Sequence, residues 1–535
     1  MKVKTLFIAS IILASCEDGI LNKQPLTQLS TENFWTTPDD ALLALAGVYN
    51  KATTWSSAEH IISFDQNTDN GINRKPNSSF LTYGNLTAST SEVKSYWNNS
   101  YSEIAGCNYF LENVDRIPDF DATTKAQMVA EVRFLRAYTF FNIAQYWGGA
   151  PLVTKLLTMN ESITVDSAPK ADIVNFVLTE LDAIVGDLPD TRPAAEHGRI
   201  IKSAALGIKG RLLMAEKRWT EAAAAYKAII DLKVHQIDPQ YSELFNGKNE
   251  QSSEIIFSRK YLAGEIANST QLYYRPSLDG GWHHLNPFQG LINDYLCIDG
   301  QSIEESSLYD PAFPVVRNGV NYRDPRLLYT VFYPGISTIK SRVYQGHPDS
   351  TTVVGDVFTY DAGMTGYCLQ KFVDNDYTGD VYSSGVDIPI IRYAEILLSY
   401  LECKINEGVI VDRDLLDLTI NAVRNRTSVQ MPAVTETDKS KLLEILKRER
   451  RVELAWEGLR YWDLIRWGEV ALLDNTPQYG IFLTDSPATY TRYPVGADGH
   501  YFVITLKYRS DNLPWPFPQD ELDINTSLTQ KDNWK

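Results

Sequence analysis

A run of oxygen-bearing side chains between Asp65 and Gly71 comes nearer to a metal-binding loop than any other segment of this sequence. Asp65, Asn67 and Asp69 place carboxylate and amide oxygens at alternate positions, and Ca²⁺ prefers such oxygen ligands. The glycine comes one residue later than in an EF-hand loop, and Pro76 stands where a bidentate glutamate is needed. The sequence therefore predicts a polar turn and no cofactor, with a structural calcium ion as the alternative.

Common local signatures of a catalytic centre do not occur in this sequence. It has no H-E-x-x-H zinc motif, no G-x-S-x-G nucleophile motif and no G-x-x-x-x-G-K phosphate loop. Two carboxylates that cleave a glycosidic bond need only meet in space, so chance pairs among 67 Asp and Glu residues predict nothing. The adjacent His283 and His284 would diverge in an extended loop. We therefore predict a protein that is not an enzyme and has no metal site.

The N-terminal segment carries the features of a lipoprotein export signal. Met1 to Lys4 supplies positive charge, Thr5 to Ala14 is a short apolar run, and Leu13-Ala14-Ser15-Cys16 resembles a lipobox. Residues 1–15 are predicted to be a signal peptide, and Cys16 is predicted to receive the lipid. No later run reaches the roughly 18 apolar residues that a membrane helix needs, so the acyl chains would be the membrane attachment.

The charge of the chain limits its partners. The formal net charge is −17, and no separate basic patch stands out along the sequence. Because an acidic surface repels phosphate, we predict that nucleic acid is not a partner.

The cysteines after Cys16 show no sign of zinc chemistry. They form no C-x-x-C pair and have no histidine at metal-ligand spacing. An even number in an exported protein permits disulfides, but a chain of 535 residues can bury a large core without them. We predict buried free thiols at Cys107, Cys297, Cys368 and Cys403.

Helical periodicity dominates residues 16–230 and returns near the C-terminus. In Gln127 to Trp147, apolar residues follow helical spacing on two sides, which is typical of a helix lying between other helices. Further helices are predicted at Ile388 to Asn406, Arg413 to Arg426 and Lys439 to Arg466. The last of these carries alternating Arg and Glu residues, which form either a solvated face or salt bridges between helices. The tryptophans predicted to face the core are Trp97, Trp456, Trp462 and Trp467.

One helix pair has a more specific pattern. Gly210, Leu213, Trp219, Ala222 and Tyr226 fall at the offsets used by tetratricopeptide repeats. In such repeats, small residues let two antiparallel helices approach and aromatic residues fill the gap between repeats. Two later positions depart from the pattern, so it does not establish the fold alone.

Residues 262–387 differ from the rest because they show little helical period and are rich in Tyr, Gly, Pro and Asp. An irregular segment of this length usually has a function. Its apolar stretches, such as Leu327 to Tyr333, predict a few strands or hairpins. No low-complexity linker marks a domain boundary, so we predict one compact unit with an N-terminal region at 16–230 and a C-terminal region at 231–535.

Separate sequence blocks between Cys16 and the last residue match one protein family in order. The blocks are Leu21 to Pro25, Asn33 to Trp35, Arg133 to Tyr138, Trp147 to Leu152, Arg323 to Leu327, Ile388 to Glu395, Asn421 to Arg426, Glu449 to Leu454, Glu457 to Gly468 and Pro514 to Leu522. With these blocks the chain resembles the SusD/RagB family of outer-membrane lipoproteins of Bacteroidetes. Glu17-Asp18, directly after the lipobox, is similar to the acidic surface-export signal of such lipoproteins.

The resemblance implies a mainly α fold of about four tetratricopeptide-like helix pairs with a loop-rich, irregular ligand-binding subdomain. It also implies a surface lipoprotein that binds oligosaccharide nutrients and passes them to a SusC-like TonB-dependent outer-membrane transporter. A tether of this kind raises the effective concentration of captured ligand beside its transporter. Some family members bind peptides, so a peptide receptor is one alternative, and a repeat scaffold that binds no nutrient is another.

Two stretches of this chain correspond to the loops in which family members tend to place ligand-binding groups. A sugar ring needs a flat aromatic face against its C–H groups and planar polar groups for its hydroxyls. The residues of this kind in the two stretches are Asp65, Asn67, Asp69, Arg74, Tyr83, Trp282 and His283. We predict that they bind the glycan.

Overall fold

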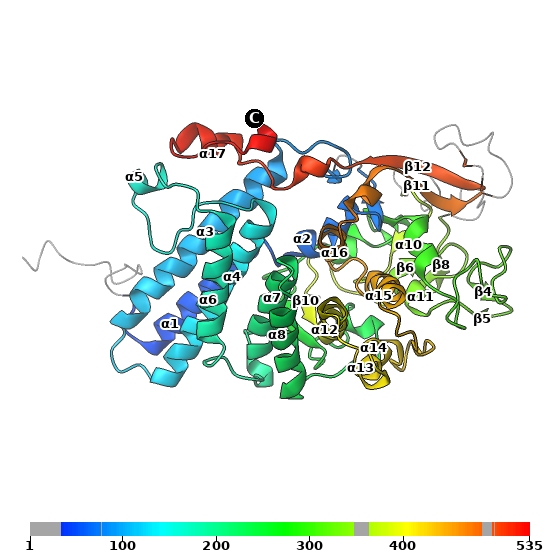
Figure 1. Ribbon diagram of the computed structural model, residues 1–535, viewed down its shortest axis with the longest axis horizontal. Helices are drawn as coiled ribbons and strands as arrows, with labels where there is room; N and C mark the ends of the chain where they lie inside the picture. The colour runs from blue at the N-terminus through cyan, green and yellow to red at the C-terminus, as the bar shows by residue number, and fades with distance from the viewer. Residues whose placement is uncertain (1–33, 76–77, 347–362, 484–494, 497) are drawn as a thin grey trace, which may run out of the picture.

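Helices form most of the computed structural model, which describes residues 34–75, 78–346, 363–483, 495–496 and 498–535 (Figure 1). The predicted signal peptide and Cys16 lie outside the described residues. The N-terminal helices are α1 (Pro38–Lys51), α2 (Ala58–Ile61), α3 (Ser91–Asn113), α4 (Ala122–Tyr146), α5 (Met159–Ser162), α6 (Lys170–Ile184), α7 (Lys202–Ala215) and α8 (Trp219–Leu232). The later helices are α9 (Thr270–Tyr273), α10 (Gln289–Asp294), α11 (Arg326–Thr330), α12 (Tyr393–Glu407), α13 (Arg413–Leu418), α14 (Ile420–Arg424), α15 (Lys439–Glu453), α16 (Arg460–Trp467) and α17 (Gln519–Ile524).

The long helix α4 lies at the centre of the N-terminal part. It packs against α3 on one side and α6 on the other, with α1 beyond α3, as the left half of Figure 1 shows. Ala130, Phe134 and Ala137 on one face and Val132 and Leu135 on another are all buried. The apolar residues on two sides of this segment therefore predicted its position between other helices correctly.

Helices α7 and α8 form the pair whose spacing resembles a tetratricopeptide repeat. They are joined by a turn at residues 216–218, in which Lys217 takes a positive φ of 56°. A Cβ atom at Gly210 would lie 2.5 Å from the ring of Tyr226, so only glycine lets the two helices approach this closely. α12 packs on α8, and α15 packs on α12. The mainly helical prediction is confirmed, and the number of such repeats stays a prediction.

Three of the predicted helices have other boundaries in the structure. Residues Ile388–Arg392 form strand β10, which pairs antiparallel with β2 (Ile255–Arg259), and the helix begins only at Tyr393. The predicted helix from Lys439 to Arg466 is two helices, because Trp456 and Gly458 adopt positive φ angles of 65° and 74°. The third, Arg413 to Arg426, breaks at Thr419 between α13 and α14.

The insertion 262–387 is built from short helices and two-stranded ribbons, on the right of Figure 1. The prediction of a strand at Leu327 to Tyr333 is largely wrong, because residues 326–330 form α11 and only Val331–Phe332 form a strand. All strand pairs among the described residues are antiparallel. The other strands are β1 (Gly71–Asn73), β3 (Leu285–Pro287), β4 (Val316–Arg317), β5 (Val320–Asn321), β6 (Val331–Phe332), β7 (Thr338–Ile339), β8 (Arg342–Val343), β9 (Cys368–Leu369), β11 (Asp474–Phe482) and β12 (His500–Lys507).

The last residues of the chain complete the core of the N-terminal helices. The backbone N–H of Trp515 donates to the carbonyl of Tyr146 at 2.7 Å, and Nε1 of Trp147 donates to the carbonyl of Pro516 at 3.0 Å. Trp97 is buried against Trp147 and Phe517 in the same aromatic cluster. Trp456 is also buried, and Trp462 is partly buried and packs against the core, as predicted. Trp467 is only partly buried and is not packed against this core, which corrects the prediction for that residue.

The alternating Arg and Glu residues of α15 form salt bridges inside the protein. Glu449 and Glu453 are buried, and both accept hydrogen bonds from Nη1 of the buried Arg326, at 2.6 and 2.9 Å. Glu453 also pairs with Arg392 and Arg426, which come from β10 and the end of α14. Burial alone would raise the pKa of Glu453, but these arginines outweigh it and lower the pKa to about 2. The pattern therefore joins helices and does not form a solvated face.

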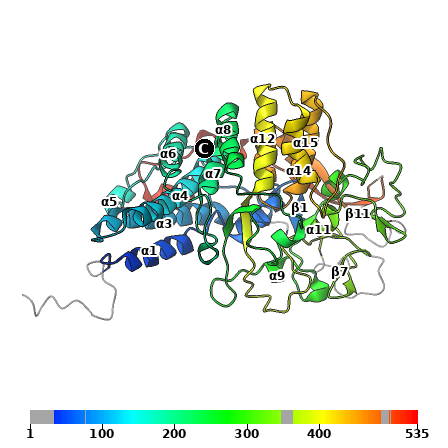
Figure 2. The ribbon, with the colours of Figure 1, turned by 90° about the horizontal axis from the view of Figure 1, so that it is seen from below.

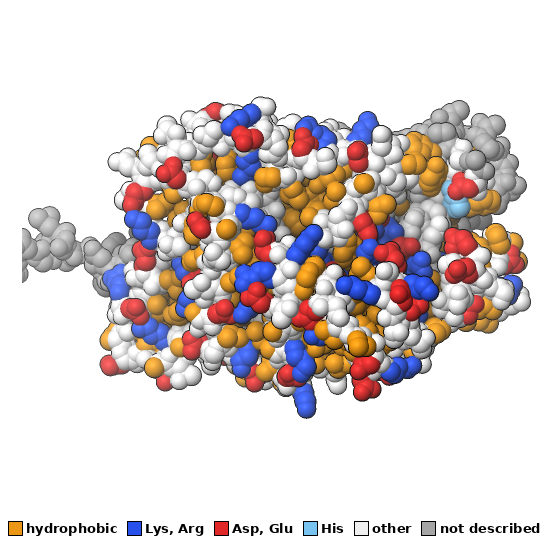
Figure 3. Space-filling model, in the orientation of Figure 1, with side chains coloured by type: hydrophobic (Ala, Val, Ile, Leu, Met, Phe, Trp, Pro, Cys, Tyr) orange, Lys and Arg blue, Asp and Glu red, His pale blue; other side chains and the backbone are white. Residues whose placement is uncertain are grey.

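The four described cysteines are buried free thiols, as predicted. On the face drawn in Figure 3, acidic and basic side chains are interspersed and do not gather into a patch of one sign. In the part of the chain that the structure describes, no helix is both long and apolar enough to cross a membrane.

Candidate functional site

The predicted loop residues Asp65, Asn67 and Asp69 lie in the interior. Asp69 accepts two hydrogen bonds from Arg460, at 2.9 and 2.8 Å, and forms a salt bridge with Arg451. Burial alone would raise the pKa of Asp69, but the two guanidinium groups outweigh it and hold this pKa well below its usual range. This carboxylate therefore fastens the loop to the C-terminal helices, and it has no free oxygen facing solvent.

The other two loop residues also bond to the protein itself. Oδ2 of Asp65 accepts the backbone N–H of Trp456 at 2.6 Å, and burial raises the pKa of Asp65 to about 7. Oδ1 of Asn67 accepts the backbone N–H of Leu81 at 3.1 Å. Their burial separates both side chains from any ligand at the surface. Within the described residues, no three His, Cys, Asp or Glu side chains are placed to hold a metal ion.

Three rings lie together at the surface around Trp282, and we name Tyr273, Trp282 and His284 the aromatic platform. The rings of Tyr273 and His284 are stacked, with centroids 4.8 Å apart and an interplanar angle of 19°. Trp282 lies 5.2 Å from Tyr273 and 5.5 Å from His284, and it is 38% exposed. Trp282 thus offers an exposed aromatic face to solvent, supported by the two stacked rings behind it.

Main-chain bonds and one glycine fix the platform. The N–H of Trp282 donates to the carbonyl of Leu272 at 2.7 Å, and the N–H of His284 donates to that of Tyr273 at 2.8 Å. A Cβ atom at Gly281 would lie 2.0 Å from the carbonyl oxygen of Arg275, so no other residue fits there. These contacts hold residues 281–284 against α9, with His283 in the left-handed region at a φ of 50°.

The two adjacent histidines point in opposite directions, as the sequence predicted. His283 is fully buried, and its Nε2 lies 3.1 Å from the carbonyl oxygen of Tyr367. His284 is partly exposed and belongs to the platform. His283 is thus a predicted ligand-binding residue that the structure places in the core.

Basic residues lie beside the platform. The N–H of Arg74 donates to the carbonyl of His284 at 2.8 Å, where β1 runs beside β3. Burial, together with the positive charges of Arg74 and Lys75, lowers the pKa of His284 to about 4. The imidazole is therefore neutral at physiological pH and stacks as an uncharged ring. Arg74 and Trp282, two of the predicted site residues, are brought together here.

The sequence missed part of the platform and included a residue that lies apart from it. Tyr273 and Lys75 were not predicted, and His284 was noted only as the neighbour of His283. No signal in the sequence pointed to His284, because His283 adopts a positive φ of 50° and the alternation of side chains in an extended strand does not apply here. Tyr83 is half-buried, and its ring forms no aromatic pair with the described rings of the platform.

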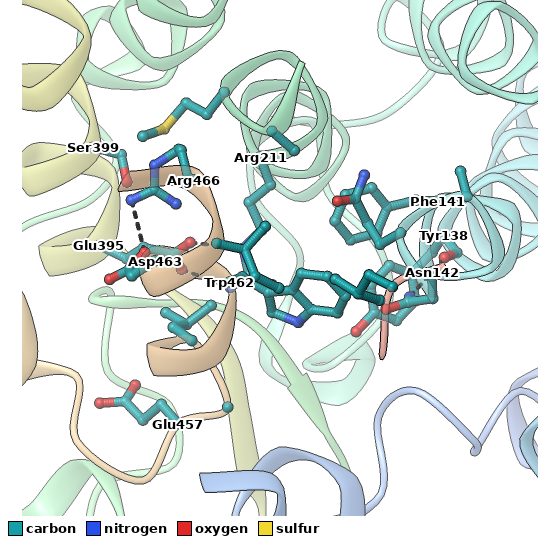
Figure 4. A pocket seen from close by; sticks show the side chains of 18 of the residues that line it. Tyr138, Phe141, Asn142, Arg211, Glu395, Ser399, Glu457, Trp462, Asp463 and Arg466 are labelled. Carbon is teal, nitrogen blue, oxygen red and sulfur yellow. Dashed lines mark hydrogen bonds and ion pairs between the residues drawn. The ribbon is translucent and has the colours of Figure 1, made fainter. Parts of the chain in front are cut away.

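A separate cavity of about 490 Å³ lies between α4, α7, α12 and α16 (Figure 4). Tyr138, Phe141 and Asn142 line it from α4, and Trp462 and Asp463 line it from α16. It shares no lining residue with the platform. In Figure 2, α9 of the platform lies at the lower edge of the molecule, whereas α8 and α12 lie at the upper edge.

These features define a helical scaffold that carries a surface aromatic site, and comparison with known proteins identifies its class. The chain belongs to the SusD family, whose model matches residues 253–534. A second family, described as "Starch-binding associating with outer membrane", matches residues 27–213. Proteins of this kind bind glycans.

Individual relatives cover nearly the whole chain. The chain is 35% identical to a SusD-like carbohydrate-binding protein from Bacteroides fragilis, with a TM-score of 0.86, covering 93% of this chain and 100% of that one. It is 23% identical to SusD-like protein P25 from Formosa agariphila, over 99% of both chains. Surface glycan-binding protein A from Bacteroides thetaiotaomicron shares the fold, with 19% identity, a TM-score of 0.68, and 93% of this chain and 100% of that one covered.

Proposed function

We propose that this protein binds an oligosaccharide on the aromatic platform and delivers it unchanged to a SusC-like TonB-dependent transporter. The observation that supports the proposal is the exposed Trp282 beside the stacked rings of Tyr273 and His284. The C–H face of a sugar ring packs on such a surface, because it excludes water there without losing hydrogen bonds. Arg74 and Lys75, next to the rings, supply donors for the hydroxyl groups.

The proposed anchor is a lipid on Cys16 that holds the protein at the outer face of the outer membrane. Residues 17–33 would form the link between this lipid and α1. Held in this way, the receptor meets its transporter at a high effective concentration, so that modest affinity for the glycan is enough.

The test is a titration of the full chain with a panel of oligosaccharides and with a peptide digest, by calorimetry. We expect saturable binding of at least one oligosaccharide. Trp282→Ala should weaken it by about tenfold or more, because one lost stacking contact is worth roughly 1–2 kcal/mol. Trp534→Ala, near the C-terminus, is the matched control and should leave the affinity unchanged.

Other results would change the proposal in defined ways. Binding of peptides and of no oligosaccharide would make the protein a peptide receptor. Binding of an oligosaccharide with equal affinity by wild type and Trp282→Ala would move the site away from the platform. No binding of either class would favour a scaffold that holds other surface proteins together.

A further inference from the structure

We propose that the cavity between α4, α7, α12 and α16 is a second binding site, for a neutral mono- or disaccharide. It is separate from the platform and does not depend on the function proposed above. The volume of about 490 Å³ falls within the roughly 300–1,000 Å³ that is usual for small-molecule sites. A ligand of one or two sugar rings fits this range, whereas a polysaccharide does not.

The walls of the cavity are largely apolar and aromatic. Tyr138 and Phe141 lie on one face of α4, and Met214 lies opposite on α7. The indole of Trp462 extends from α16 into the space between them (Figure 4). Trp462 is held edge-on by Tyr146, with ring centroids 4.8 Å apart. These rings offer flat surfaces to a ligand that has an apolar ring face.

The charged side chains in the cavity already pair with one another. Arg211 donates to both oxygens of Glu395 at 2.6 Å. Arg466 donates to Asp463 at 2.7 Å, and Lys170 pairs with Glu216 at 2.6 Å. A charged ligand would lose its hydration without finding an opposite charge that is free to pair. The chemistry of the lining therefore selects an uncharged ligand.

Two polar groups in the lining have no hydrogen-bond partner in the part of the chain that the structure describes. They are the hydroxyl of Tyr226, a residue that is 0% exposed, and Nε2 of Gln145. Buried polar atoms are rarely left unpaired, and such atoms indicate a missing water or ligand. An acyl chain or another wholly apolar ligand would leave both unpaired. The hydroxyl groups of a sugar would satisfy both, and its ring would pack on Trp462.

Tyr226 belongs to the helix pair that forms one wall of the cavity. Its ring lies directly against the backbone of α7 at Gly210. The ring position is therefore fixed by helix contact, and the hydroxyl contributes nothing to it. Tyr226→Phe should therefore remove the hydroxyl without moving the ring that forms part of the cavity wall.

The experiment uses the full chain carrying Tyr273→Ala, Trp282→Ala and His284→Ala together, so that no ring of the platform remains. Saturation-transfer NMR would be recorded with glucose, galactose, mannose, xylose, N-acetylglucosamine, maltose, cellobiose and lactose, each at up to about 10 mM. We expect at least one of these sugars to bind. Tyr226→Phe should weaken that binding by about tenfold, the effect of one lost hydrogen bond.

A filling substitution gives a second, independent test. Ala215→Trp places a large ring in the cavity and should abolish binding, whereas Ala224→Trp, on the exposed face of α8, should not affect it. Unchanged thermal unfolding of Tyr226→Phe would show that the protein remains folded. The proposal is overturned if no sugar of the panel binds, or if both Tyr226→Phe and Ala215→Trp bind as well as their parent. Because the platform is already removed, neither result bears on its function.

Discussion

The helical frame and the insertion 262–387 bond their main chains in different ways. In α4, each carbonyl accepts the amide four residues later, so the side chains between helices need only be apolar. The insertion has few helical hydrogen bonds of this kind, and buried guanidinium groups donate to its main-chain carbonyls instead. Arg323 donates to the carbonyl oxygens of Ile292, Tyr295 and Pro314, and its side chain is 2% exposed. Arg275 likewise donates to the carbonyl oxygen of Asp374, at 2.9 Å.

This difference shows how an irregular segment can hold a rigid site. An unpaired buried carbonyl costs about 1–3 kcal/mol, so each arginine that bonds several of them fixes several loops at once. The stability of the insertion then depends on a few side chains, whereas the stability of the frame is spread over many apolar contacts. The insertion should therefore be more sensitive than the frame to the loss of single residues.

Arg326→Ala should have the largest effect on stability. Arg326, in the insertion, bonds Asp324 of its own segment and Glu449 and Glu453 of α15, and all four residues are buried. Its removal takes the salt bridge from the buried Asp324 and one of the arginine partners from each buried glutamate, and we expect a loss of about 3–5 kcal/mol in the free energy of unfolding. Denaturant unfolding measures this loss.

The matched control for Arg326→Ala is Arg413→Ala. Arg413 pairs with Asp417 on the exposed surface of α13, where solvent screens the pair, so its removal should change the stability little. Equal effects of the two substitutions would mean that the buried salt bridges stabilise the insertion no more than a surface pair does.

Gly210→Ala should have an intermediate effect, and it probes the frame. The added Cβ lies 2.5 Å from the ring of Tyr226, so α7 and α8 must separate or the ring must turn. Such overpacking costs about 1–3 kcal/mol. Gly186→Ala is the control, because a Cβ there meets no atom within 4 Å. A loss as large as that of Arg326→Ala would contradict the idea that the frame distributes its stability.

Lowering the pH should have the smallest effect on stability, and a similar effect in the frame and in the insertion. Burial lowers the pKa of His60, in the frame, to about 3 and that of His283, in the insertion, to about 4. Below the ordinary pKa of about 6.5, the unfolded chain takes up protons that the folded chain does not, so stability falls as the pH falls. At pH 5.5, each histidine should cost about 1.4 kcal/mol relative to pH 7.5.

The pH prediction is checked by unfolding titrations at several pH values. His60→Phe and His283→Phe should each flatten the dependence of stability on pH between about pH 6.5 and 4. A slope that neither substitution changes would assign the acid sensitivity to other groups.

Helix positions in the frame could be predicted because their apolar residues repeat with the helical period. The two faces of α4 and the close contact at Gly210 are local signals of this kind. Helix ends near Thr419 and Trp456 could not be predicted in the same way, because non-glycine residues there adopt unusual backbone angles that depend on tertiary contacts. β10 was missed because its apolar run continues directly into α12.

The site was predicted only in part, for a different reason. Arg74 and Trp282 were both chosen as ligand-binding residues and lie near each other in the structure, and their role in binding stays a prediction. Asp65 and Asp69 look like surface residues in the sequence, because a polar loop gives no sign of the distant Arg460 that buries Asp69. Tyr273 was missed because its stacking on His284 depends on the main-chain hydrogen bonds between residues 282–284 and α9.

The contact between the end of the chain and the N-terminal helices affects when the protein can fold. The hydrogen bond from Trp147 to the carbonyl of Pro516 cannot form until Pro516, which lies 369 residues later in the chain, has been synthesised. The aromatic cluster of α3 and α4 therefore stays open to solvent throughout synthesis and closes only when the last segment arrives. The N-terminal helices without this last segment therefore lack part of their aromatic core.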